Sequence, residues 1–224
     1  MIIFIAGTII FLVAYLFGSI PTGYLAGMLV KGIDIREHGS FSSGATNALR
    51  TLGRWPAAAV LLIDVLKGVA AILFAIWFFS WLSEVQLSSN LSTVDTQTKG
   101  SWFVALAGIG ALVGHSRSIW LGFAGGKSAA TGLGVLLGMS WPIGLGAALV
   151  FAISLAASRI VSVSSMSAAT AAVALVLALE RPLPYRILVC AGALYVIFRH
   201  RANIQRLLNG AEPKLGQTSP AKEP

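Results

Sequence analysis

The chain has 224 residues, of which 56% are hydrophobic and only 11% are charged. Soluble domains carry about 25% charged residues, so the composition argues against an ordinary soluble domain and predicts an integral membrane protein. The formal net charge of +8 lies mostly in short loops, which favours topology signals beside anionic lipid over nucleic-acid binding. The single cysteine excludes a disulfide within the chain.

Seven hydrophobic segments follow one another along the chain, and they predict an all-α integral membrane protein. A spanning helix needs about 20 apolar residues. Residues 128–158 would form a helix of about 46 Å, too long for one span, and Pro142 is expected to divide them. Some helices should therefore be short or broken, and the first segment is interpreted as an uncleaved span. The predicted segments are residues 2–29, 56–82, 102–121, 128–140, 142–158, 162–179 and 184–198.

The basic residues predict the orientation of these segments. One side of the membrane would carry twelve Lys and Arg residues in its loops and tail, and the other side three, Lys99, Arg181 and Arg186. Basic loops remain cytoplasmic, so we expect the N-terminus outside and the C-terminus in the cytoplasm. Loop 83–101 would then be external. A single seven-helix domain is expected over residues 1–213, with a disordered cytoplasmic tail over residues 214–224.

Four of five polar clusters fall on the predicted cytoplasmic face, and the fifth, GSIPTG, leads into it. This segregation predicts one site at the membrane edge, built from several loops. Within these clusters Arg50 follows SSGATNAL and Lys127 follows GG, each beside an expected helix start. Helix starts with free N–H groups and a nearby cation are typical of phosphate binding. Gly122 leaves three residues before Gly126-Lys127 where a Walker A loop needs four, so a P-loop ATPase is not expected.

The remaining polar residues divide between chemistry and packing. His38, His115 and His200 have no carboxylate-rich cluster beside them, so no metal site is expected. His200 and Asn203 are three residues apart and should share a helical face. They could hold a substrate hydroxyl, or they could equally cap and pack the last helix.

Three motifs in this order resemble the bacterial PlsY family of membrane glycerol-3-phosphate acyltransferases: GSFSSGATNALR at 39–50, GHSRSIWLGFAGGK at 114–127 and RHRANIQRLL at 199–208. The resemblance implies transfer of a fatty acyl group from acyl phosphate to the sn-1 hydroxyl of glycerol 3-phosphate, which gives lysophosphatidic acid and phosphate. It implies a bacterial plasma-membrane enzyme with no metal, no other cofactor and no nucleic-acid partner. Membrane lipid and a peripheral enzyme that makes acyl phosphate are the other implied partners.

The resemblance also implies which residues form the site. Ser40, Arg50, Lys127, His200 and Asn203 correspond to catalytic positions. The proton of the attacking hydroxyl would pass to a substrate phosphate, with His200 as the alternative base. Substrate-binding positions are Ser162, with Ser164 and Ser165 as alternatives, together with Thr46, Asn47, His115, Gly125 and Gly126.

The sequence departs from the family pattern at two places. The family reads GSGNxGATN where this chain has Phe41-Ser42-Ser43, and GGKGVAT where it has Ser128-Ala129. These changes would affect rate and acyl-chain preference more than the reaction class. The alternatives from other classes are a transporter for a small phosphorylated anion, which would need polar residues near the middle of the membrane, and a non-catalytic protein that binds anionic lipid.

Overall fold

The computed structural model describes residues 2–88 and 96–217, and the regular secondary structure within these ranges is helical apart from one β-bridge, between Ser118 and Ala124. Two 3₁₀ turns, η1 (Ile35–Glu37) and η2 (Ile119–Leu121), lie in the loops. The α-helices are α1 (Ile2–Ser19), α2 (Thr22–Lys31), α3 (Ala45–Thr51), α4 (Arg54–Ser88), α5 (Thr96–Ser116), α6 (Ala129–Met139), α7 (Trp141–Ser158), α8 (Val161–Ala178), α9 (Leu183–Arg199) and α10 (Arg201–Leu208).

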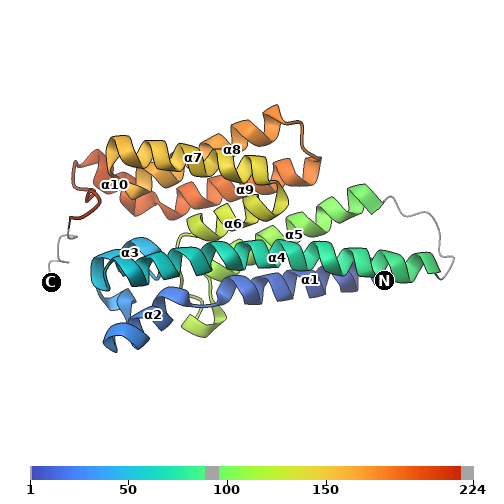
Figure 1. Ribbon diagram of the computed structural model, residues 1–224, viewed down its shortest axis with the longest axis horizontal. Coiled ribbons are helices and arrows are strands. Elements are labelled where there is room, and N and C mark those ends of the chain that lie inside the picture. The colour runs from blue at the N-terminus through green and yellow to red at the C-terminus, as the bar shows by residue number, and fades with distance from the viewer. Residues whose placement is uncertain (1, 89–95, 218–224) are drawn as a thin grey trace.

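The helices form an elongated bundle in which α4 extends along most of the long axis (Figure 1). Helix α1 packs on α4 and α5, and α7, α8 and α9 pack together on the opposite side of the bundle. Helix α6 contacts both α4 and α7 and so joins these two groups. The short helices α2, α3 and α10 lie at one end of the bundle, and the N-terminus lies towards the other (Figure 1). The predicted polar clusters therefore gather at one end.

Several helices in the described ranges meet the requirements for crossing a membrane. Four spans are long and apolar enough, or up to five if α9 and α10, bent by 55°, count as one. The chain is therefore a multi-pass membrane protein with an all-helical fold. The four spans are Ile2–Lys31, Arg54–Val85, Trp141–Ser158 and Val161–Ala178.

The predicted division of residues 128–158 is confirmed. Helix α6 ends at Met139 and α7 begins at Trp141, with Pro142 in its first turn. Helix α6 has 11 residues, or about 16 Å at 1.5 Å per residue, which is too short to cross a hydrocarbon core of about 30 Å.

Two predicted boundaries are wrong. The segment predicted over 102–121 stops being an α-helix at Ser116. The residues that follow close a tight loop, in which Ser118 and Ala124 form a β-bridge and the Ser118 N–H donates to the Ala124 carbonyl. The expected external loop 83–101 is shorter than predicted, because α4 continues to Ser88 and α5 begins at Thr96. Residues 89–95 of that loop and 218–224 of the predicted tail lie outside the described residues. Within the tail, the N–H of Leu215 donates to the Arg159 carbonyl at 2.6 Å.

Glycines let the helices that carry the site approach one another closely. A Cβ on Gly134 of α6 would lie 1.9 Å from the Val65 carbonyl oxygen of α4, and one on Gly68 would lie 2.3 Å from the Thr131 carbonyl oxygen. Without side chains at these positions the two backbones can meet, as small residues allow between membrane helices. The start of α6 is thereby held close to α4.

Candidate active site

A cavity of about 330 Å³ lies where the polar loops meet the helices of the bundle. One part of its wall is polar or charged and comes from α3, the loop before α6, α8, α10 and the segment after α10. The rest is lined by apolar and small side chains of α4, α6, α7, α8 and α9. The cavity is therefore amphipathic, as a site for a charged group joined to a lipid chain would need to be. The polar and charged lining residues are Ser40, Ser42, Thr46, Asn47, Arg50, Asp64, His115, Lys127, Ser128, Ser162, Ser165, His200, Asn203 and Glu212.

The loop before α3 is held in place by the side chain of Asn47. Its Oδ1 accepts the Ser40 N–H at 2.7 Å, and its Nδ2 donates to the carbonyls of Ile35 at 2.6 Å and Ser42 at 2.8 Å. Asn47 is fully buried. Its amide thus bonds to the loop backbone and fixes the position of Ser40 at the cavity wall, which Asn47 also lines.

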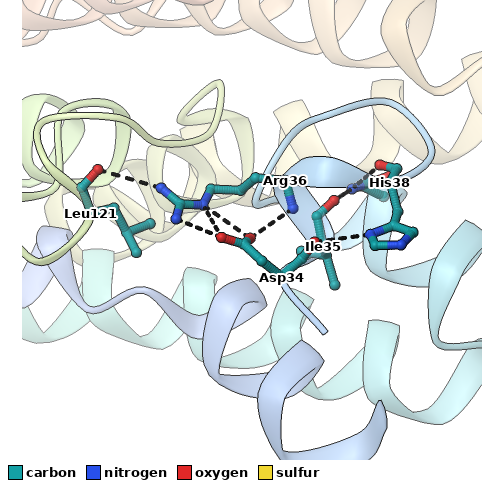
Figure 2. Close-up of polar contacts among 6 residues, drawn as sticks. Asp34, Ile35, Arg36, His38 and Leu121 are labelled. Atoms are coloured by element: carbon teal, nitrogen blue, oxygen red, sulfur yellow. Dashed lines mark hydrogen bonds and ion pairs between the residues drawn. The ribbon is translucent and has the colours of Figure 1, made fainter. Parts of the chain in front are cut away.

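A second polar network, around Asp34 and Arg36, also supports the loop before α3 (Figure 2). The Arg36 guanidinium forms an ion pair with Asp34 at 2.6 Å, and its Nη1 donates to the Leu121 carbonyl at 3.4 Å. His38 Nδ1 lies 3.0 Å from the Asp34 carbonyl oxygen. The hydrogen bonds from Arg36 hold the pKa of Asp34 below its ordinary value. Arg36 therefore joins the loop before α3 to the loop after α5.

Lys127 connects the loop before α6 to α10. Its Nζ donates to Asn203 Oδ1 at 2.6 Å. Asn203 Nδ2 donates to Glu212 Oε1 at 2.6 Å, and Ser162 Oγ donates to the same oxygen at 2.8 Å. Arg206 Nε donates to Glu212 Oε2 at 2.7 Å. One carboxylate thus connects α8, α10 and, through Asn203, the loop that carries Lys127.

The electrostatics of this network favour anion binding. Burial lowers the pKa of Lys127 to about 8; Glu212 opposes this shift, and the nearby cations Arg206 and Arg50 add to it. Burial alone would raise the pKa of Glu212, but hydrogen bonds from Asn203, Ser162 and Arg206 hold it below its ordinary value. Several cations thus surround one carboxylate, and a phosphate group would reduce their mutual repulsion.

His200 presents one ring nitrogen for a ligand. It occupies the junction between α9 and α10, and its Nδ1 lies 2.7 Å from the Val196 carbonyl oxygen. A carbonyl oxygen can only accept, so Nδ1 carries the hydrogen and Nε2 is left as an acceptor. Both His200 and Asn203 line the cavity.

A buried polar cluster extends from the cavity wall, where Asp64 and His115 lie, to Thr22 and Lys67. Asp64 Oδ1 accepts from Lys67 Nζ at 2.8 Å and from Thr22 Oγ1 at 2.5 Å, and it lies 3.6 Å from His115 Nδ1. Lys67 Nζ also donates to the Ile20 carbonyl at 3.0 Å, at the break between α1 and α2. The Asp64–Lys67 ion pair is thus part of a packed network that fastens α4 to α2, to the break between α1 and α2, and to α5.

Most of the predicted site residues meet at this cavity. The exceptions are Gly125 and Gly126, which do not line it and instead pack against His115 on α5. Of the three alternative serines, Ser162 and Ser165 line the cavity, whereas the Ser164 hydroxyl donates to the Ile160 carbonyl. The predicted residues that line it are Ser40, Thr46, Asn47, Arg50, His115, Lys127, Ser162, His200 and Asn203. Among the described residues, no group of three or more His, Cys, Asp or Glu is placed to hold a metal ion.

Glu212 is the residue at the centre of the network that the sequence reasoning missed. It stands in GAEP beyond the last motif, and the other charged residues from Arg199 to Lys214 are basic. This acidic residue close after a basic helix was the available signal, but only the fold brings its carboxylate within hydrogen-bond distance of Ser162 and Asn203.

The two departures from the family pattern occupy left-handed backbone. Ser128 has φ 62° and Phe41 has φ 55°, a region that favours glycine, and each stands where the resembling family has glycine. The hydroxyl of Ser128 donates to the Leu112 carbonyl at 2.8 Å. The loop geometry is therefore retained without glycine at these two positions.

Comparisons with known proteins agree with this fold. The family model described as glycerol-3-phosphate acyltransferase matches residues 8–210. Glycerol-3-phosphate acyltransferase 2 of Rhizobium johnstonii is 61% identical over 98% of this chain and 100% of that protein. Crystal structures of PlsY, an integral membrane glycerol 3-phosphate acyltransferase, superpose with a TM-score of 0.77 for the glycerol 3-phosphate form and 0.76 for the lysophosphatidic acid form. Both are 30% identical and cover 94% and 93% of this chain, and 96% and 94% of their own.

The fold and the site thus define a multi-pass membrane enzyme of acyl transfer. The chain belongs to the glycerol-3-phosphate acyltransferase family. The resemblance inferred from the three motifs is confirmed.

Proposed function

We propose that this chain transfers a fatty acyl group from acyl phosphate to the sn-1 hydroxyl of glycerol 3-phosphate, forming 1-acylglycerol 3-phosphate and inorganic phosphate. The observation that carries the proposal is the amphipathic cavity, in which Lys127 and Arg50 belong to a polar part of the wall and apolar side chains line the rest. A transporter would need polar residues distributed across the membrane, and these polar residues gather at one end of the bundle.

Lys127 and Arg50 are the proposed phosphate contacts. Arg50 lies in the last turn of α3 and Lys127 directly before the start of α6. A guanidinium and an ammonium from separate elements can bind different oxygens of one phosphate. Lys127 also stabilises the charge that develops when the acyl carbonyl is attacked. Ser40, Thr46 and Ser162 supply hydroxyl groups along the same wall.

His200 and Asn203 are the proposed contacts of the attacking hydroxyl. Nε2 of His200 would accept a hydrogen bond from this hydroxyl and so orient it. The hydroxyl oxygen forms the new ester bond to the acyl carbon, and the bond between that carbon and the phosphate oxygen breaks. The proton leaves with the departing phosphate, whose low basicity makes a strong acid catalyst unnecessary. Apolar side chains of α6 to α9 enclose the acyl chain.

The proposed topology has seven hydrophobic segments, with the N-terminus outside, the C-terminus in the cytoplasm and the cavity at the cytoplasmic edge of the bacterial plasma membrane. The positive-inside distribution of Lys and Arg supports this orientation. A cavity at that edge would receive glycerol 3-phosphate from the cytoplasm and acyl phosphate from a peripheral enzyme at the membrane. Residues 1–213 form the proposed membrane domain.

The decisive assay uses purified protein in detergent with palmitoyl phosphate, labelled glycerol 3-phosphate and EDTA. We expect the wild type to form labelled lysophosphatidic acid and Lys127→Ala to lose at least about a hundredfold in rate. Lys214→Ala, which removes an exposed lysine, is the matched control and should retain full rate. Product from acyl-CoA or acyl-carrier protein, but not from acyl phosphate, would refute the donor. No product from any donor would refute the reaction.

A further inference from the structure

Arg199 contacts the loop that carries Lys127 without lining the cavity itself. Its Nη2 donates to the Gly126 carbonyl at 2.8 Å and to the Gly125 carbonyl at 3.1 Å. The two carbonyls belong to consecutive residues, so one guanidinium nitrogen fixes the orientation of two peptide groups directly before Lys127. Hydrogen bonds from a charged donor are among the stronger ones in proteins.

The rest of the loop is fastened on the opposite side by α5. The Gly126 N–H donates to the His115 carbonyl at 3.1 Å, and Ser128 Oγ donates to the Leu112 carbonyl at 2.8 Å. Gly126 also lies directly against the His115 ring, because an added Cβ would approach Nε2 to 2.2 Å. The loop is thus held between α5 and the end of α9, and Arg199 supplies the contacts from α9.

Arg199 and His200 are adjacent in the chain. The position of the Lys127 loop is therefore tied to the α9–α10 junction that carries His200 and Asn203. The bond from Lys127 Nζ to Asn203 at 2.6 Å joins the same two segments through side chains. The Arg199 side chain joins them through the backbone carbonyls of Gly125 and Gly126.

We propose that Arg199 is a positioning residue that holds the Gly125–Lys127 segment so that the Lys127 ammonium faces the substrate phosphate. The inference rests on the proposed function, because it assigns Arg199 a part in the same site. Without these two hydrogen bonds the Gly126 carbonyl loses its contact with Arg199, and the Gly125–Gly126 peptide group keeps its bond to the His115 carbonyl but loses the one to Arg199. The direction of Lys127 is then less firmly fixed. Small displacements of a binding cation are enough to lower affinity and rate.

The first comparison is the affinity for glycerol 3-phosphate of the purified protein, measured by isothermal titration calorimetry. Arg199→Gln should raise Kd about tenfold, the order expected from losing a charge-assisted hydrogen bond. Arg199→Lys keeps the charge and one donor and should recover part of this loss. Arg201→Gln is the matched control, because Arg201 is exposed and lies over the Phe198 ring with 5.0 Å from Cζ to the centroid. It should bind as the wild type does.

A double-mutant cycle separates positioning from a direct or general structural role. If Arg199 acts through Lys127, then Arg199→Gln should weaken binding no further in a Lys127→Ala background. A second tenfold loss in that background, or equal affinity for Arg199→Gln and the wild type, would overturn the proposal. Thermal unfolding of each variant checks the fold, and a melting temperature lowered equally by Arg199→Gln and Arg199→Lys, with affinity lost equally, would indicate a structural role only.

The acylation assay keeps the two proposals apart. If the wild type forms no lysophosphatidic acid, the proposed function fails, and the binding cycle still decides the role of Arg199. If the wild type is active and Arg199→Gln binds and reacts as Arg201→Gln does, the positioning role fails while the function stands.

Discussion

Lys127 and Asn203, separated by 76 positions in the chain, share a hydrogen bond of 2.6 Å from Nζ to Oδ1 at the wall of the cavity. This bond joins the glycine-rich loop to α10, and Glu212 holds Asn203 from its other side. The ammonium is therefore directed by a neutral acceptor and not by a carboxylate. Its positive charge is left available to a phosphate.

The pH dependence of the reaction should report Lys127. Its pKa is lowered to about 8, chiefly by burial, so the free enzyme loses this positive charge as the pH rises through 8. We expect kcat/KM for glycerol 3-phosphate, which reports groups of the free enzyme, to fall on the alkaline side near pH 8. The acidic side should follow the second ionisation of phosphate esters, at about pH 6.

The matched variant for this profile is Lys127→Arg. An arginine stays protonated throughout the accessible range, so whatever activity remains should lose the alkaline limb near pH 8. An unchanged limb in Lys127→Arg would assign that ionisation to another group.

Glu212→Ala should lower both stability and activity. Glu212 accepts hydrogen bonds from Ser162, Asn203 and Arg206, and each loses its acceptor in the variant. The free energy of unfolding should fall by about 1–3 kcal/mol, and the rate should fall because Asn203 no longer fixes Lys127. Thermal unfolding and product formation measure the two effects. Glu84→Ala, which removes an exposed glutamate of α4, is the control and should change neither.

The same carboxylate gives a stability contribution that depends on pH. The pKa of Glu212 is held below its ordinary value of 4.5, so its contribution is fully present above about pH 4.5 and is lost as the pH falls through the lowered pKa. Glu212→Gln should therefore differ from the wild type in melting temperature at pH 7 more than at the lowest pH at which both fold. A constant difference would contradict this linkage.

Gly126→Ala tests how closely the glycine-rich loop meets α5. The added Cβ would lie 2.2 Å from His115 Nε2, a ring that packing and its contact with Asp64 hold in place. The loop must move, and Lys127 moves with it, so we expect at least about a hundredfold loss of rate. In Gly7→Ala the new Cβ meets Leu106 at 3.4 Å, an ordinary contact, and activity should be retained. Full activity of Gly126→Ala would show that the loop can shift without consequence.

The sequence predicted the parts of the site that local pattern determines. Arg50 and Lys127 were identifiable because each lies near an expected helix start. Helix α3 begins at Ala45, five residues before Arg50, and α6 begins at Ala129, one residue after the predicted start of that segment. The break between α6 and α7 followed from Pro142. These features depend on residues close together in the chain, for which propensity and spacing are informative.

Features that depend on distant contacts were not predictable in the same way. Glu212 becomes part of the site only because the segment after α10 brings it to Ser162 of α8. The sequence also did not reveal that the Asn47 amide bonds to the backbone of the loop around Ser40. The end of α5 at Ser116 depends on the Ser118–Ala124 bridge, which an apolar pattern continuing to residue 121 does not reveal.

Ser128 provides a test of backbone strain at the loop. Its φ of 62° lies in the left-handed region, where a residue with a side chain costs about 1–2 kcal/mol, and its hydroxyl bond to the Leu112 carbonyl offsets this cost. Ser128→Gly removes the strain and the hydrogen bond together, so its stability should remain close to that of the wild type. Ser128→Ala keeps the strain and loses the bond, so its free energy of unfolding should fall by about 1–2 kcal/mol.

The order of these two variants is informative because helix propensity predicts the reverse. Alanine is favoured over glycine inside a helix by about 1 kcal/mol, whereas Ser128 precedes α6 in left-handed backbone. Thermal unfolding should therefore rank Ser128→Gly above Ser128→Ala, and acyl transfer should follow the same order since Lys127 is the preceding residue. If Ser128→Ala were the more stable variant, the left-handed geometry at this position would be refuted, and with it the explanation of why glycine suits this position in the family pattern.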